Sequence, residues 1–396
     1  MISTIRNRPP TTIAIAAAVV AVLSGPAGPC QAGEPNAPAI RSLRVALPGQ
    51  QRNAVKQSWP SIGCWFWTDR EFQPDGYRDF LDKAEKYSDF ALLTTSIRAR
   101  KEVTDPAVHD QIAKAADYAK ARGMGLVMDL DVRLARNAFA QKYPGELQEI
   151  VRIQQVKLAD SGKVAATAGT VGGGDHYTFA SWQYSPVAGR LLRVYSYRSG
   201  NGGIDPASVA DITARCKLTQ ADAKSVTVEI PCREGDANRT ACVMTANTML
   251  TPDVFAPHLL EFERAILRQY ADVALAGACK DEWGFPGGLA NPSQLWFSSA
   301  LADAYAARRP GHDLPRDLLL MSLGEKGRDV ERAVAVNHYM AMIGARCAEV
   351  EQAFYRQVKQ AIENSDRFYQ VTENISDDRE MILCKLWYDR REGLVS

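Results

Sequence analysis

Strands and helices alternate at short intervals between residues 61 and 130, and this order constrains the fold more than any other feature. Residues 61–67, 90–97 and 124–130 are short apolar runs typical of buried strands. The segments between them, 75–87 and 105–123, carry apolar residues at three- and four-residue steps, as amphipathic helices do. Since parallel strands need crossover connections of about this length, the order predicts an α/β fold with a parallel sheet.

The pattern changes between residues 151 and 250, where Gly, Thr and Ser become frequent. Residues 191–197 and 226–230 alternate apolar and polar side chains, the period of a half-buried strand. Clusters of turn residues such as 199–203 separate these runs. We therefore predict an antiparallel, β-sandwich-like domain that is inserted into the α/β frame.

Helical patterns return at Phe255, and the segments after it complete the predicted frame. We expect helices at 255–270, 294–308 and 329–364, and strands at 273–280 and 367–373. The frame then has five parallel strands, whereas a closed (β/α) barrel has eight. The sequence predicts a TIM-barrel-like frame that is incomplete at the C-terminus. The frame consists of residues 56–150 and residues 251–396, which are separated by the insertion at 151–250. Residues 33–55 precede it as an extended leader.

The first 32 residues have the pattern of a signal peptide. Arg6 and Arg8 precede an apolar stretch at 13–23, and small residues follow up to a cleavage site after Ala32. Cys30 opens the alternative of a lipid-anchored start, but the residues before it, Ala27-Gly28-Pro29, disfavour that reading. We expect a periplasmic or secreted protein with no membrane association beyond export.

The net charge limits the classes of molecule that the protein is expected to bind. A formal net charge of +1 without basic clusters argues against nucleic-acid binding and favours a neutral or weakly charged partner.

Seven of the eight cysteines lie beyond the predicted cleavage site, and we expect at most three disulfides. One of these should lie in the β-domain and involve Cys232 or Cys216. Cys232 and Cys242 flank a polar loop across which they could be bridged, and Cys216 is a competing partner. The cysteine and histidine spacings match no zinc site, so neither a metal nor a cofactor is predicted.

Two carboxylates at the end of the predicted strand 273–280 are the main candidates for chemistry. Asp281 and Glu282 are followed by Trp283, a Gly and a Pro. A carboxyl group beside an apolar ring is poorly solvated, so its pKa rises and it can donate a proton near neutral pH. The alternative is a structural salt bridge at the rim of a domain. For Asp281 we expect such a pairing, with Arg98 or Arg133.

The other strand ends carry further candidates, because catalytic residues of barrels lie at the C-terminal ends of strands. Trp65 and Trp67 would bind a sugar ring, and we expect only one of them to point into the barrel. Asp129 and Asp131 would bind sugar hydroxyls or a hard cation, or would pair with Arg133. The remaining predicted site residues are Arg98 and Trp283 for substrate binding, Glu282 as general acid/base, and Glu373 as the weaker candidate for nucleophile.

Together these motifs resemble a group of secreted bacterial proteins classed as glycoside-hydrolase-like. The resemblance covers residues 58–369 and is carried by Cys64-Trp65-Phe66-Trp67, Asp129-Leu130-Asp131 and Asp281-Glu282-Trp283-Gly284-Phe285-Pro286. It implies a TIM barrel with a β-rich insertion, a polysaccharide or oligosaccharide substrate, and Glu282 or Asp281 as a catalytic residue. The group continues after the fifth strand with aromatic-rich strands, from which residues 374–396 differ. This departure leaves open a non-catalytic carbohydrate-binding protein. A metal-assisted hydrolase based on Asp129 and Asp131 is disfavoured, since the histidines are scattered.

The mature protein should begin near Gly33, because cleavage after Ala32 satisfies the small-residue rule. N-terminal sequencing of exported material checks this start. A lipid-modified N-terminus at Cys30 would contradict the periplasmic or secreted location.

Overall fold

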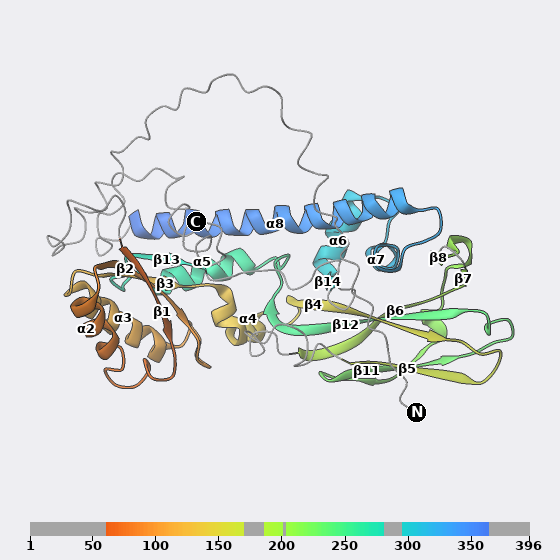
Figure 1. Cartoon of the computed structure of the whole chain (residues 1–396), viewed down its shortest axis with the longest axis horizontal. Coiled ribbons are helices and arrows are strands. Elements are labelled where there is room, and N and C mark those ends of the chain that lie inside the picture. The colour runs from red at the N-terminus through yellow and green to blue at the C-terminus, as the bar shows by residue number, and fades with distance from the viewer. Residues whose placement is uncertain (1–60, 170–185, 201–202, 281–294, 364–396) are drawn as a thin grey trace, which may run out of the picture.

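The computed structural model describes residues 61–169, 186–200, 203–280 and 295–363, and the structural statements below concern these residues. The described chain forms a parallel α/β region and an antiparallel β region, and a long C-terminal helix lies along both (Figure 1). The mixed α/β architecture with a parallel sheet, predicted from the sequence, is present.

Four strands form the parallel sheet in the order β1-β2-β3-β13. They are β1 (Ser61–Trp67), β2 (Phe90–Ile97), β3 (Gly125–Asp129) and β13 (Gly277–Cys279). The connections between the first three strands are the helices α2 (Arg78–Tyr87) and α3 (Pro106–Lys120). After β3 the chain forms a short 3-10 helix, η1 (Val132–Ala135), and then α4 (Arg136–Lys142).

Local sequence explains where these helices begin. In α3, Pro106 occupies the first turn and the Asp105 carboxylate accepts a hydrogen bond from the Ala107 N–H at 2.9 Å, so one of the unpaired N–H groups of the first turn is satisfied. Helix α2 starts three residues later than predicted. Asp75 has a positive φ of 57°, and a Cβ at Gly76 would lie 2.0 Å from the Arg70 carbonyl oxygen, so both residues belong to a tight turn.

The antiparallel region has two packed sheets and a small two-stranded one, β7 (Ser199–Gly200) with β8 (Gly203–Ile204), and none of them joins the parallel sheet. Residues Val194, Val226, Val228, Ile230 and Val243 pack between the two sheets as in a sandwich. Leu147 pairs with Pro252, so the two ends of the segment 147–252 lie side by side. The larger sheet has the order β14-β4-β12-β6-β9 and the smaller β10-β11-β5; their strands are β4 (Leu147–Lys157), β5 (Lys163–Gly169), β6 (Pro186–Tyr197), β9 (Ala210–Asp211), β10 (Lys217–Ala221), β11 (Ser225–Pro231), β12 (Thr240–Pro252) and β14 (Leu295–Phe297).

Two elements differ from the sequence-based prediction. Residues 295–297, expected to open a helix, form β14 and pair with β4, and helix α6 (Ser299–Arg308) begins only after them. Three apolar residues in a row do not distinguish a buried strand from a buried helical turn. The strand expected at 273–280 is reduced to the three residues of β13, because the N–H groups of Val273 and Leu275 are bonded within turns. The strand expected at 367–373 lies outside the described residues.

The predicted disulfide in the β region was wrong. Cys216, Cys232 and Cys242 are free thiols. Cys232 packs against the apolar cluster between the two β-sheets, whereas Cys242 is buried in the main core. Because Cys232 and Cys242 belong to different clusters, the sequence distance between them was a poor guide to their separation in space.

The long helix α8 (Asp329–Glu363) joins the two regions. Its 35 residues correspond to about 52 Å, and it runs above α5 (Leu259–Gln269) and β13 at one end and α6 and α7 (Leu314–Leu323) at the other (Figure 1). The Tyr339 hydroxyl donates to the Trp296 carbonyl at 2.7 Å, and the Arg346 Nε donates to the Val254 carbonyl at 2.9 Å. No helix within the described ranges is long and apolar enough to cross a bilayer.

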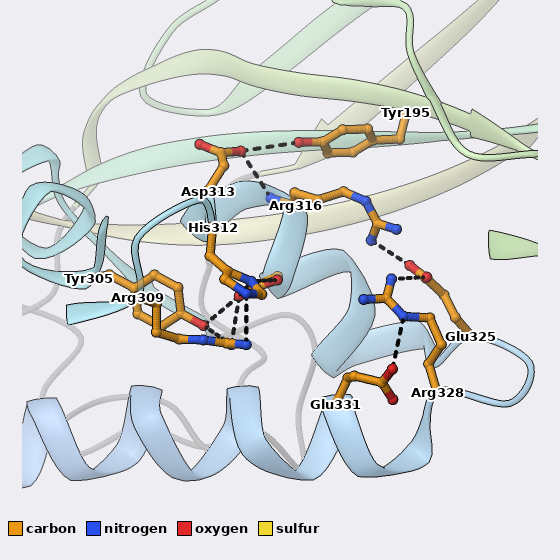
Figure 2. Close-up of polar contacts among 10 residues, drawn as sticks. Tyr195, Tyr305, Arg309, His312, Asp313, Arg316, Glu325, Arg328 and Glu331 are labelled. Carbon is orange, nitrogen blue, oxygen red and sulfur yellow. Dashed lines mark hydrogen bonds and ion pairs between the residues drawn. The ribbon is translucent and has the colours of Figure 1, made fainter. Parts of the chain in front are cut away.

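A polar network holds α6 and α7 together next to α8. Tyr305, Arg309 and His312 point toward one another (Figure 2). All three contact the buried carboxylate of Asp317: the Tyr305 hydroxyl at 2.6 Å, an Arg309 nitrogen at 2.8 Å and the His312 Nδ1 at 3.1 Å. Arg309 and Asp317 have side chains that are 9% and 6% exposed, so their ion pair is largely desolvated.

A second network fixes the turn between α7 and α8. Glu325, whose side chain is buried, is paired with Arg316 and with Arg328, the latter at 2.8 Å (Figure 2). Burial opposes the ionisation of Glu325, but the hydrogen bonds from the two arginines outweigh it and hold its pKa below the ordinary value. The backbone next to this residue is also bonded, since the Lys326 N–H donates to the Ile204 carbonyl at 2.8 Å.

Replacing Asp317 by Asn should lower the free energy of unfolding by about 3 kcal/mol, because it leaves the Arg309 charge buried without its counter-charge. Urea unfolding at pH 7 measures the loss. Asp303→Asn, an exposed change on α6, is the matched control and should have an effect below about 0.5 kcal/mol. Equal stabilities for D317N and the unmodified chain would contradict the role of this network.

Candidate active site at the carboxyl edge of the parallel sheet

The carboxyl ends of the four parallel strands bring polar side chains to one edge of the sheet. Ser96 is paired with Phe66 of β1, and Asp129 ends β3 opposite Cys279 of β13. Arg98 and Lys280 directly follow the ends of β2 and β13. The structure therefore brings together Arg98, Asp129 and Asp131, three of the predicted site residues, at the edge where parallel α/β folds place their active sites.

Asp129 lies at the centre of this edge and is buried. Its carboxylate accepts hydrogen bonds from the Ser96 hydroxyl at 2.7 Å and from the Asp131 backbone N–H at 3.1 Å. Burial, followed by the neighbouring Asp131 charge, raises the pKa of Asp129 to about 7, although Arg133 and the hydrogen bonds act in the opposite direction. Asp129 can therefore hold a proton near neutral pH.

Asp131 is fully buried and serves a local structural purpose. It caps η1, since its carboxylate accepts a hydrogen bond from the Arg133 N–H at 2.8 Å, and it forms an ion pair with the Arg133 Nε at 3.1 Å. Of the three roles considered from the sequence, pairing with Arg133 is the one that the structure shows. The second carboxylate oxygen, Oδ2, has no hydrogen-bond partner within the described part of the chain.

A buried ion pair closes the same edge on the side of β13. The Lys280 ammonium lies 2.6 Å from the Glu263 carboxylate of α5, and their side chains are 4% and 0% exposed. On its other side the ammonium lies 4.5 Å from the centre of the Phe354 ring of α8. Burial raises the pKa of Glu263 to about 7, against the opposing effect of Lys280. Sequence reasoning missed this pair, because Glu263 lies inside the helix expected at 255–270 and no sequence pattern relates it to Lys280.

Arg98 lies at the more open end of the edge. Its guanidinium donates to the Ser96 hydroxyl at 2.8 Å and lies over the Phe66 ring, 4.6 Å from the ring centre. The Phe66 side chain is 39% exposed. Phe66 is a second residue that the sequence reasoning missed.

The two tryptophans predicted to bind a sugar are instead part of the core. Their ring centres are 5.0 Å apart, Trp65 stacks on Phe80 at 4.5 Å, and Trp67 lies 5.4 Å from Phe72. We expected only one of them to point into the barrel, on the premise that they alternate across the strand. This premise was wrong, because residues two apart on a strand lie on the same face, and both rings are buried. The same alternation was the available signal for Phe66, which lies between them and faces the opposite side.

Four predicted site residues, Asp281, Glu282, Trp283 and Glu373, lie outside the described residues. One of the described ranges ends at Lys280, the residue directly before Asp281. No group of three or more His, Cys, Asp or Glu side chains in the described ranges is arranged to hold a metal ion. The edge as described thus offers buried acids, a guanidinium and an exposed aromatic ring.

No known protein-family model matches the sequence, and no curated protein matches it either. The chemistry of the edge therefore has to be inferred from its own residues.

The contribution of Asp129 to the free energy of unfolding should fall as pH rises from about 4 to about 7. Asp129 binds its proton more tightly in the folded chain than in the unfolded chain, whose carboxyl pKa is about 4, so deprotonation favours unfolding in this window. Asp129→Asn should remove up to about 1.4 kcal/mol per pH unit from the slope, measured by urea unfolding between pH 4.5 and 7.5. The exposed Asp69→Asn is the control and should leave the slope unchanged. Parallel curves for D129N and the unmodified chain would show that Asp129 ionises normally.

Proposed function

We propose that this protein is a secreted glycoside hydrolase whose active site is the carboxyl edge of the parallel sheet. In this proposal the four strands belong to a TIM-barrel-like frame that is incomplete at the C-terminus. The observation that carries it is the buried carboxyl group of Asp129 at this edge, which accepts a hydrogen bond from Ser96 and whose pKa is raised by burial to about 7. Glycoside cleavage needs an acid that is still protonated near neutral pH, and an environment that excludes water favours such an acid.

The roles follow from sequence order and from the described contacts. Glu282 is the proposed proton donor, since it comes two residues after Lys280, whose ammonium is fixed by Glu263 and Phe354. Asp129 itself is buried, and it acts through Ser96 on the position of Arg98. Asp281 and Glu373 are the candidates for the second carboxylate, which a retaining enzyme places about 5–5.5 Å from the acid.

A second function is favoured by one specific observation. Phe66 and Arg98 form an aromatic and cationic surface at the edge, and this surface does not depend on any catalytic pair. A carbohydrate-binding protein without hydrolytic activity would keep this surface and would need no second carboxylate.

Hydrolysis of a panel of aryl glycosides by the mature chain tests the proposal. Glu282→Gln should lower turnover of substrates with poor leaving groups by about 10²–10⁴-fold, because they depend on proton donation. Substrates with activated aryl leaving groups should lose much less. Glu261→Gln, an exposed change on α5, is the matched control and should leave turnover unchanged.

Equal losses for both kinds of leaving group in E282Q would remove Glu282 from the role of proton donor. Binding of oligosaccharides by an unmodified chain that cleaves none of them would favour the carbohydrate-binding function.

A further inference from the structure

The outer face of α8 is exposed and apolar. Three of the seven large apolar side chains that are exposed in the described ranges lie on this one helix, those of Val330, Val334 and Met340. The helix runs along the outside of the molecule (Figure 1). Between Arg332 and Glu349 its exposed residues include no Asp, Glu, Lys or Arg. Since 23% of the residues in the whole chain are charged, an uncharged helix face of this length indicates a contact surface.

The exposed residues of this face recur at four- and three-residue steps, the spacing at which one helix packs along another. They are Val330, Val334, Asn337, Ala341, Gly344 and Ala348. The opposite side of α8 packs on the core through buried residues that include Tyr339, Met342 and Phe354. The helix therefore has a second face suited to helix packing, and in the described chain this face is exposed.

The fold of the single chain does not require a glycine at position 344. Gly344 lies near the middle of α8, and a Cβ at this position would meet no atom within 4 Å. Glycine is the poorest helix former after proline, so its presence here weakens the helix. A glycine on a helix surface also lets another part of a protein approach the backbone closely. Gly344 thus favours a partner that packs tightly against this face.

The face is complementary to itself when it is reversed. If two copies of α8 lie antiparallel about an axis near the middle of the face, Val334 lies opposite Gly344 of the second copy, and Val330 lies opposite Ala348 of the second copy. Met340 then lies next to its own counterpart at the axis. Large residues that face small ones let two helices interdigitate, here over about 27 Å of helix.

The charges at the ends of this overlap favour the same arrangement. Glu351 of one copy lies opposite the turn that precedes α8 in the other copy, where Lys326 is exposed. The carboxylate is then also close to the N-terminus of the second helix, where negative charge is favourable. A parallel arrangement would instead place Glu351 opposite Glu351, and like charges that face each other across a contact repel.

We propose that the outer face of α8 is the interface of a homodimer, in which two copies of this chain pack their α8 helices antiparallel about a two-fold axis. The same surface of both copies forms the contact, so the assembly closes at two chains. The proposal concerns a partner and does not depend on hydrolysis or sugar binding.

Sedimentation equilibrium of the full exported chain over the micromolar range tests the dimer. We expect a mass that rises with concentration to twice that of one chain. Ala341→Glu should weaken the association about 100-fold, because each copy then places a charge in the contact. Ala107→Glu, the same change at an exposed position of α3, is the matched control and should leave the association unchanged.

Gly344→Leu tests the close approach of the two helices without adding a charge. The new Cβ meets no atom of its own chain, so the thermal unfolding midpoint of the dilute monomer should not fall. The dimer should weaken about tenfold or more, because the added side chain overpacks against Val334 of the second copy. This variant keeps the test valid if Ala341→Glu does not fold.

Cysteine substitutions test the orientation of the helices. A chain that carries both Val334→Cys and Gly344→Cys should form disulfide-linked dimers on oxidation, well above the level of the unmodified chain and of each single variant, because the two positions face each other between copies. Efficient cross-linking by Val334→Cys alone would show parallel helices and overturn the antiparallel arrangement.

A chain that stays monomeric at all these concentrations would overturn the dimer, as would a dimer that neither Ala341→Glu nor Gly344→Leu weakens. Binding of the monomer to lipid vesicles through this face would assign the face to a membrane instead. Protection of Gly344→Cys from a thiol reagent in the monomer would assign it to another segment of the same chain. None of these outcomes bears on the proposed hydrolase, which the aryl glycosides test separately.

Discussion

The buried ion pair between Lys280 and Glu263 is the interaction on which the carboxyl edge of the sheet depends. It joins α5 to the end of β13, and the Phe354 ring places α8 over the same ammonium. Removing two charges from water is unfavourable by several kcal/mol per ion, and only close pairing offsets it. The contact of 2.6 Å between side chains that are at most 4% exposed meets this condition. Loss of either partner would leave an uncompensated charge in the core, so α5, β13 and α8 are held together.

The same burial sets the acid chemistry of the edge. Asp129 and Glu263 are shielded from water, and both have pKa values raised to about 7. Further contacts connect the buried Asp129 to the exposed part of the edge. Ser96 is hydrogen-bonded to both Asp129 and Arg98, and Arg98 lies over the exposed ring of Phe66. A site that combines a buried acid able to hold a proton with an ordered cation and an aromatic face suits carbohydrate chemistry, and this combination underlies the proposed function.

The sequence predicted the elements that depend on local patterns and missed the contacts that depend on tertiary structure. Strands β1 and β2 were predicted with their observed bounds, because their apolar runs are continuous and bounded by turns. Strand β14 was missed, since its three residues pair with a strand almost 150 positions earlier. Glu263 and Lys280 lie 17 residues apart on different elements, and no periodic pattern relates them. Phe66 was overlooked for a different reason. The alternation along β1 indicated that it faces the side opposite to Trp65 and Trp67, but the sugar-binding role was assigned to the two tryptophans.

The protonation state of Asp129 tests the central claim most directly. In the full chain labelled with carbon-13 at the aspartate carboxyl groups, NMR spectra recorded from pH 4 to 9 follow each titration separately, and Asp129→Asn identifies the signal. Burial at the sheet edge predicts a midpoint of about 7 for this carboxyl group. A midpoint near 4, the value of a solvated aspartate, would contradict the account, because the edge would then hold an ordinary ionised carboxylate at neutral pH.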